Sequence, residues 1–447
     1  MELKPCDEDT IVGLSRLISS RKMSCVELLR QCLNRIDERE AELRAWVHVD
    51  RQGAEIVARE RDSELAAGQS RGPLHGIPVG IKDIIDVAGF PTAAGSILRA
   101  EVQAREDAEV VRRLRAAGAI ILGKTVTTQF ACYDPPVTRN PWNVERTPGG
   151  SSSGSAVAVA SEMCPAALGS QTGGSITRPA SFCGIAGCKP TFGRVSRRGV
   201  VPVSEHLDHV GPMARTVTDL AILMDAISGY DPRDPFCVST SPINLQRALN
   251  EPYSTPPRLG RLRNFFDDHA DACAITAVDV AEECWKTAGS RMSEPVFPSS
   301  FADLPNCHRA IMAVEAAGYH EKRISDYPDD YLPGIRSLIE EGLSLPVTQY
   351  SRSLSHQRQC SRDVLEMFAD VNVLICPATV GGAPEKLTTG NPVLNSPWSY
   401  TGLPTVSIPV GLTNGGLPLS VQIVGKPFAE DELFRAAYWC ETHLTNC

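Results

Sequence analysis

The sequence predicts an α/β fold built on one large twisted sheet, mixed but mostly parallel, with helices on both faces. Between residues 75 and 124, apolar runs of strand length alternate with a segment of helical periodicity, an order typical of parallel strands joined by helices. Of the 447 residues, 42% are hydrophobic and 22% are charged, which is typical of a globular chain with a large core. Because the chain has no internal repeat, we expect a single domain over 1–447.

The N-terminal half supplies the first predicted elements. Residues 1–70 are expected to form a helical segment, because their apolar side chains recur at helical spacing. Residues 72–225 are expected to form the centre of the fold and to carry its chemistry. The first elements of this centre are a strand at 75–81, a helix at 107–117 and a strand at 119–124.

The C-terminal half falls into two parts of different composition. Residues 231–350 are rich in charge, proline and helix formers and lack glycine-rich loops, so we expect a peripheral helical insertion or lid. Residues 371–447 are expected to complete the core with three strands and one helix. The strands are predicted at 371–377, 405–410 and 419–424, and the helix from residue 430.

Charge and targeting signals exclude several classes of function. The net charge of -9 and the lack of a basic run argue against a nucleic-acid partner. The chain offers neither a secretion signal nor the roughly 18 apolar residues that a membrane span needs, so we expect a cytoplasmic protein without a membrane partner. Cys and His residues show none of the usual metal-ligand spacings, and we therefore expect no metal and no cofactor.

A first chemical motif is the loop of small residues GGSSSGS at 149–155, which includes Ser151 and leads into the run AVAVA. Such a loop leaves backbone amides free to face a ligand. A phosphate site is one interpretation, but the Lys-Ser/Thr ending of a P-loop is absent. A flexible linker is another, although linkers are usually flanked by polar sequence rather than by a core helix. The apolar run that follows the loop therefore favours a loop at a functional site over a linker.

A second motif lies 24 positions further on, in the sequence QTGGSITRPA at 171–180. Pro179 suits the first turn of a helix, so the amides from Thr172 to Ser175 are expected near a helix N-terminus. Thr172, Gly173, Gly174 and Ser175 could then form an oxyanion hole, because glycine lets the backbone approach a carbonyl oxygen closely. The alternative is a turn serine that caps a helix.

A third feature is Lys82, which lies in the apolar sequence GIPVGIKDII at 76–85. A lysine is usually a solvated surface group. Burial among apolar neighbours would lower its pKa and leave a neutral amine that can act as a base. No histidine lies in the three motifs, so a Ser-His-Asp triad has little support.

Together these residues resemble the amidase signature family, from about residue 20 to the C-terminus and most densely over 72–225. The motifs that carry the resemblance are GIPVGIKD at 76–83, TPGGSSSG at 147–154, QTGGS at 171–175 and FCGIAGCKP at 182–190. The resemblance implies the amidase signature fold and a Ser-cisSer-Lys triad, in which Lys82 acts through Ser151 on the nucleophile Ser175. It also implies an acyl-enzyme and a supporting hydrogen bond from Ser170.

Two departures from the family pattern bear on the substrate. Many members carry Asp where Gln171 stands and Arg where Thr177 stands, whereas this chain has its arginine at Arg178. This arrangement is most similar to the malonamidase-type amidases, which implies that Arg178 clamps a substrate carboxylate. The alternative is a structural ion pair of Arg178 with Asp83 or Asp134.

The sequence therefore predicts a serine amidohydrolase for a small amide that carries a carboxylate, such as a malonamate-like or ureido acid. The candidate substrate-binding residues are Arg178, Gly150, Ser170, Gln171 and Tyr133, with further walls from 231–350. One alternative is the A component of an amidotransferase, which releases ammonia for aminoacyl-tRNA. A catalytically silent scaffold is another. A homodimer is the expected assembly.

Overall fold

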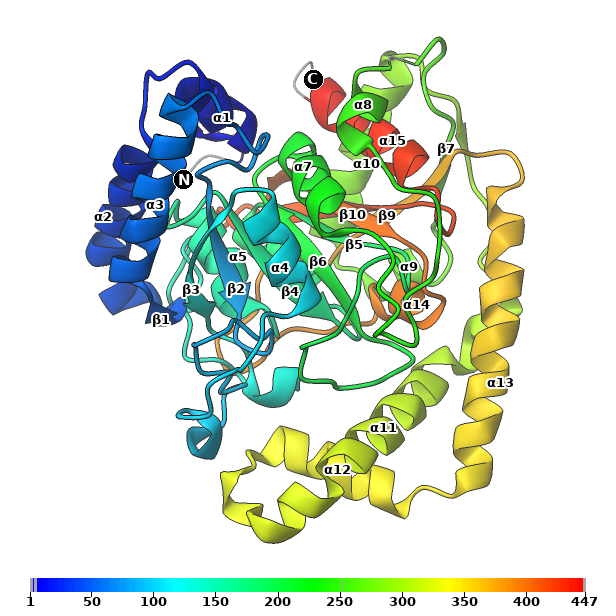
Figure 1. Ribbon diagram of the computed structural model, residues 1–447. Coiled ribbons are helices and arrows are strands. Elements are labelled where there is room, and N and C mark those ends of the chain that lie inside the picture. The colour runs from blue at the N-terminus through cyan, green and yellow to red at the C-terminus, as the bar shows by residue number, and fades with distance from the viewer. Residues whose placement is uncertain (1–2, 4–5, 252, 445–447) are drawn as a thin grey trace.

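The computed structural model describes residues 3, 6–251 and 253–444, and in these ranges one sheet of eleven strands forms the centre (Figure 1). The strands are β1 (Trp46–Val49), β2 (Pro78–Lys82), β3 (Ile120–Thr125), β4 (Ala166–Gln171), β5 (Ala186–Lys189), β6 (His209–Ala214), β7 (Leu259–Arg261), β8 (Met292–Ser293), β9 (Val373–Pro377), β10 (Thr405–Leu412) and β11 (Pro418–Val424). Their order in the sheet is β1-β3-β2-β4-β6-β5-β10-β11-β9-β7-β8.

The sheet is mixed, as predicted, but most neighbouring strands are antiparallel, so the prediction of a mostly parallel sheet is wrong. β2 runs parallel to β3 and β4, and β7 runs parallel to β8 and β9. The other neighbouring pairs are antiparallel. The connection from β10 to β11 is too short for a crossover helix, and this forces an antiparallel pair. The strand–helix–strand order at 75–124 therefore describes only one part of the sheet.

Helices of very different length cover the sheet and extend beyond it. They are α1 (Ile11–Ser19), α2 (Cys25–Leu43), α3 (Arg51–Ala66), α4 (Glu109–Ala116), α5 (Ser153–Ala160), α6 (Thr177–Cys183), α7 (Val217–Ile227), α8 (Leu245–Leu249), α9 (Phe266–His269), α10 (Ala272–Thr287), α11 (Leu304–Asp326), α12 (Pro333–Ser344), α13 (Val347–Asp363), α14 (Ser396–Tyr400) and α15 (Glu430–His443). Helices α4, α7 and α15 form one packed group, and α5 and α6 form another against β4 and β5.

The two ends of the chain agree with most of the predicted elements. The predicted strand at 75–81 is β2, the helix at 107–117 is α4, and the strand at 119–124 is β3. The three predicted C-terminal strands are β9, β10 and β11, and α15 begins at Glu430 as expected. The N-terminal segment is mostly helical, but it also contributes the edge strand β1.

The region 231–350 is only partly the peripheral helical insertion that its composition predicts. It also contains β7 and β8, which extend the sheet at the edge opposite to β1. These strands have three and two residues, too few for an alternating pattern to be read from the sequence. Helices α11 and α12 project away from the sheet, and α13 returns along its side (Figure 1).

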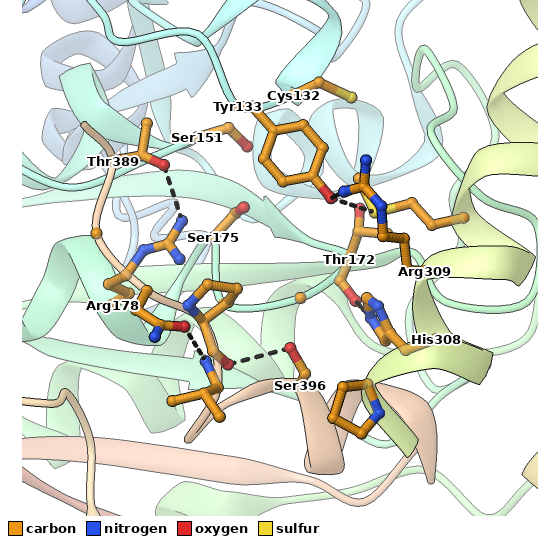
Figure 2. A pocket seen from close by; sticks show the side chains of 18 of the residues that line it. Cys132, Tyr133, Ser151, Thr172, Ser175, Arg178, His308, Arg309, Thr389 and Ser396 are labelled. Atoms are coloured by element: carbon orange, nitrogen blue, oxygen red, sulfur yellow. Dashed lines mark hydrogen bonds between the residues drawn. The ribbon is translucent and has the colours of Figure 1, made fainter. Parts of the chain in front are cut away.

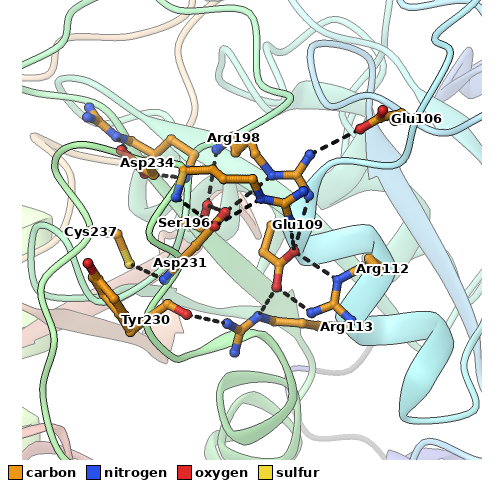
Figure 3. Close-up of polar contacts among 12 residues, drawn as sticks. Glu106, Glu109, Arg112, Arg113, Ser196, Arg198, Tyr230, Asp231, Asp234 and Cys237 are labelled. Carbon is orange, nitrogen blue, oxygen red and sulfur yellow. Dashed lines mark hydrogen bonds and ion pairs between the residues drawn. The ribbon is translucent and has the colours of Figure 1, made fainter.

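A buried ionic cluster fixes α4 to the loops that follow β5 and α7 (Figure 3). The carboxylate of Glu109 accepts hydrogen bonds from Arg112, Arg113 and Arg198, and Arg198 also contacts Asp231. These bonds lower the pKa of Glu109 to about 2, and the hydrogen bond from Arg112 contributes most. The Glu109 carboxylate therefore stays ionised over the neutral and mildly acidic range and keeps α4 bound to these loops.

Candidate active site

Two neighbouring parallel strands position the centre of the site. Lys82 is the last residue of β2, and Ser170 lies near the end of the adjacent strand β4. The carboxyl ends of parallel neighbours meet at one edge of a sheet, which is where α/β proteins usually bind ligands. The chain leaves β4 into the loop that contains Ser175, so the strand pair brings the predicted residues to one place.

The amine of Lys82 lies between two serine hydroxyls. Its Nζ is 2.7 Å from Ser151 Oγ and 2.8 Å from Ser170 Oγ, and the side chain is fully buried. Burial lowers the pKa of Lys82 to about 7, although the nearby Asp208 carboxylate acts in the opposite direction. A substantial fraction of the amine is therefore neutral near pH 7 and can accept a proton.

The loop before α5 presents Ser151 from a rigid base. The Gly150–Ser151 peptide bond is cis, as the family resemblance implied. Helix α5 is buried from Ser153 to Val159, which explains why it contains only small residues and valines and no charge. The amide of Ser152 donates a 3.3 Å hydrogen bond to the carbonyl of Ser175, so the two serine loops lie against each other.

The side chain of Gln171 fixes the loop that contains Ser175. The Gln171 side-chain oxygen accepts hydrogen bonds from the amides of Ile176 and Thr177 at 2.9 and 3.0 Å. Within residues 6–251 and 253–444, the amides of Gly173, Gly174 and Ser175 donate no hydrogen bond to another group of the chain. Such free amides at a close turn can stabilise an oxyanion.

A cavity of about 330 Å³ opens beside these loops (Figure 2). Ser151 and Ser175 both line it, together with the whole predicted oxyanion loop from Thr172 to Ser175. Figure 2 shows the two serine hydroxyls on the same side of the cavity. The thiol of Cys132 also faces this space, but burial raises its pKa well above the usual range, so it is no rival nucleophile at neutral pH.

Arg178 lies at the floor of the cavity with part of its hydrogen-bonding capacity unused. Its Nη2 donates to the carbonyl of Gly150 at 2.8 Å and to Thr389 Oγ1 at 3.4 Å. Its Nε and Nη1 are buried and have no hydrogen-bond partner in the described part of the chain. Burial lowers the pKa of Arg178 to about 10, which leaves the group charged at neutral pH.

Neither of the two carboxylates considered for a structural ion pair with Arg178 is its partner. Asp83 pairs with Lys124 instead, at 2.9 Å. The carboxylate of Asp134 accepts hydrogen bonds from the first amides of α12. Both candidate partners are therefore engaged elsewhere, which a single sequence does not reveal.

Only two of the five candidate substrate-binding residues line the cavity. Arg178 and Tyr133 do. The other three lie behind its wall: Gly150 contacts Arg178 through its carbonyl, Ser170 contacts Lys82, and Gln171 supports the loop of Ser175. Their structural contacts, rather than contact with a ligand, explain their positions.

Several residues of the site carry no recognisable signal in the sequence. His308 and Arg309 of α11 line the cavity, and His308 Nε2 lies 3.0 Å from the carbonyl of Thr172. Asp208 accepts a 2.5 Å hydrogen bond from the hydroxyl of Thr172. Each lies outside the glycine-rich motifs, so only the tertiary structure brings it to the site. The expectation that 231–350 supplies walls of the pocket agrees with the position of α11.

Comparisons with known proteins identify the family of this chain. The Amidase family matches residues 27–434. The A component of the glutamyl-tRNA(Gln) amidotransferase from Gloeothece citriformis is 34% identical, with 96% of each chain covered. A putative amidase, AmiD, from Mycobacterium bovis is also 34% identical, over 97% of this chain and 94% of that protein.

Solved structures show the same likeness. A structure described as a vestigial protein complex that reveals the origins of an s-triazine catabolic enzyme has a TM-score of 0.91 and 32% identity, over 97% of this chain and 98% of that one. The native peptide amidase from Stenotrophomonas maltophilia has a TM-score of 0.87 and 28% identity, over 98% and 97%. Among the described residues, no helix is long and apolar enough to cross a membrane. The chain belongs to the amidase signature family and is a hydrolase acting on the carbon–nitrogen bonds of amides.

Proposed function

We propose that this protein hydrolyses a small amide through a covalent acyl-enzyme on Ser175, with Ser151 and neutral Lys82 as the proton relay. One observation carries the proposal: Lys82 Nζ lies 2.7 Å from Ser151 Oγ in a fully buried setting that lowers its pKa to about 7. An unperturbed lysine, with a pKa near 10.4, would be almost wholly protonated at pH 7 and could accept no proton.

The reaction then proceeds in two halves. Ser175 Oγ attacks the amide carbonyl while its proton passes to Ser151 and the proton of Ser151 passes to Lys82. The free amides of the Gly173–Gly174–Ser175 turn stabilise the oxyanion. The relay returns a proton to the leaving nitrogen, which departs as ammonia or an amine. Water hydrolyses the acyl-enzyme by the same relay and releases the acid.

The substrate of this reaction carries a carboxylate close to the scissile carbonyl. The support is the buried guanidinium of Arg178, whose Nε and Nη1 face no acceptor in the described part of the chain. A buried charge without an ionic partner is costly, and a substrate carboxylate in the cavity beside Arg178 would neutralise it. A malonamate-like or ureido/carbamoyl acid carries such a carboxylate.

The ammonia-releasing component of an amidotransferase is the second candidate, because a relative of this kind is 34% identical over 96% of the chain. In that role the same serines would release ammonia for a partner protein. The two candidates differ in what the isolated protein can do, since a hydrolase acts alone on small amides.

We also propose that the protein is cytoplasmic and forms a homodimer. The match to amidases favours an enzyme over a silent scaffold.

A fluorophosphonate probe tests the proposed nucleophile. We expect the native protein to be labelled on Ser175, because the relay activates this hydroxyl and the cavity admits a small electrophile. The measurement is mass spectrometry of the labelled peptide. Ser175→Ala should abolish the label without a change in melting temperature. A folded sample that stays unlabelled would favour the silent scaffold.

The carboxylate clamp is tested by comparing two substrates. We expect Arg178→Ala to lower kcat/KM for malonamate by about 10²-fold, since a hydrogen bond to a charged group contributes about 1.5–3 kcal/mol. For an uncharged amide of the same size, the loss should be much smaller. Steady-state kinetics on both substrates measure the difference. An equal loss for both amides would show that Arg178 only supports the loop of Gly150.

A further inference from the structure

We propose that the contact between Tyr133 and Arg309 is a size filter at the mouth of the cavity, which selects amides with a short acyl part. The inference rests on the proposed function of this cavity. Arg309 Nη1 donates a 3.3 Å hydrogen bond to the hydroxyl of Tyr133, and the guanidinium carbon lies 5.6 Å from the centre of the Tyr133 ring. The two side chains meet across the cavity opposite Ser175 (Figure 2).

A gradient of exposure places this contact at the rim. Ser151 and Ser175 are 3% and 8% exposed, so they lie at the bottom of the cavity. Tyr133 is 39% exposed, and the side chain of Arg309 is 45% exposed. All four residues line one cavity, so the Tyr133–Arg309 contact narrows the approach from solvent to Ser175.

The two sides of the contact belong to different parts of the fold. Tyr133 comes from the loop after β3, and Arg309 comes from α11, which supplies one wall of the cavity through one face of its N-terminal half. The residues of this wall are Leu304, Pro305, His308, Arg309 and Met312, spaced as one face of a helix. The filter therefore joins the sheet to the projecting helices.

The loop of Tyr133 is fastened to α12 on both sides of the tyrosine. Gln129 accepts a 2.7 Å hydrogen bond from the amide of Leu332, and Asp134 accepts 2.8 and 3.0 Å bonds from the amides of Gly334 and Ile335. The backbone of this loop is thus fixed by the helical region.

Glu341 of α12 sets the position of Arg309. Its carboxylate accepts hydrogen bonds from Arg309 Nε at 2.8 and 3.0 Å and pairs with Nη2 at 2.5 Å. This pairing neutralises the arginine and leaves Nη1 for Tyr133. Arg309 therefore narrows the mouth of the cavity with its side chain and does not bind a second anion. Glu341 is a positioning residue, because it acts through Arg309.

Two fluorophosphonates of different length test the filter without knowledge of the natural substrate. The probes carry a methyl chain and a dodecyl chain, and the measured quantity is the ratio of their labelling rates on Ser175. We expect Arg309→Ala to raise the long-to-short ratio at least tenfold, because even one methylene too many or too few on a substrate changes discrimination by a hydrophobic pocket by about 10- to 200-fold. Glu341→Gln should raise the ratio by a smaller factor, and should add nothing in the Arg309→Ala background.

The matched control is Arg358→Ala, the same substitution at an exposed position of α13 that contacts Ser355 and lies outside the cavity. This variant should keep the wild-type ratio. An unchanged ratio in both Arg309→Ala and Glu341→Gln would overturn the filter while leaving the nucleophile in place. Failure of both probes to label wild-type Ser175 would overturn the proposed function, and the filter with it.

Discussion

Lys82→Met is expected to lower kcat by about 10²- to 10⁴-fold, the usual contribution of a general base. Methionine has a similar length and is unbranched, but it lacks the amine that lies 2.7 Å from Ser151 Oγ. The hydroxyls of Ser151 and Ser170 also lose a shared partner, so a stability loss of about 1–3 kcal/mol is expected as well. Steady-state kinetics below the melting temperature of the variant separate the two effects.

Lys82→Arg is the informative companion of this variant. Arginine keeps a positive charge and can donate hydrogen bonds to both serines, but it is not deprotonated in proteins. If the neutral amine is the working form, Lys82→Arg fails as completely as Lys82→Met. Retention of more than a tenth of the wild-type kcat by Lys82→Arg would mean that position 82 acts only through its charge.

A second large effect is expected from Ser151→Ala, again a loss of about 10²- to 10⁴-fold in kcat. Lys82 contacts Ser151 and Ser170 at nearly equal distances, 2.7 and 2.8 Å. Only Ser151 lines the cavity that holds Ser175, so only Ser151 can pass a proton between the lysine and the nucleophile. Ser170→Ala should therefore cost much less.

The comparison of these two serines separates a relay from general support of the lysine. Both substitutions remove one hydroxyl from the same amine, and both leave a cavity of the same small size. The pH profile should keep its shape in Ser170→Ala but shift slightly, because the surroundings of Lys82 change. Equal losses in the two variants would contradict the relay through Ser151.

Some of the residues that the structure gathers around Lys82 and the cavity carry local signals in the sequence. Ser151 and Ser175 lie in glycine-rich turns next to apolar elements, and Lys82 lies in an apolar strand. In each case the local pattern and the family motif agree. The same holds for α4, β3 and the C-terminal strands, whose apolar periodicity is long enough to be read.

The remaining features depend on contacts between distant parts of the chain. Gln171 and Arg178 are close in sequence, yet one supports a loop and the other faces the cavity, and no local pattern distinguishes them. Arg309 belongs to α11, which lies in the region whose composition predicts a peripheral helical insertion. β8 has only two residues and is defined by its pairing with β7. Such features follow from packing rather than from propensity.

The pH dependence of kcat/KM tests the central claim most directly, because it reports the protonation of the free enzyme. Lys82 must lose its proton to act, and burial lowers its pKa to about 7. We therefore predict that kcat/KM rises about tenfold per pH unit up to pH 7 and then becomes level, for a substrate that does not titrate in this range. A profile that stays flat from pH 5 to 9, or one that rises only near pH 10, would contradict a neutral lysine at the centre of this site.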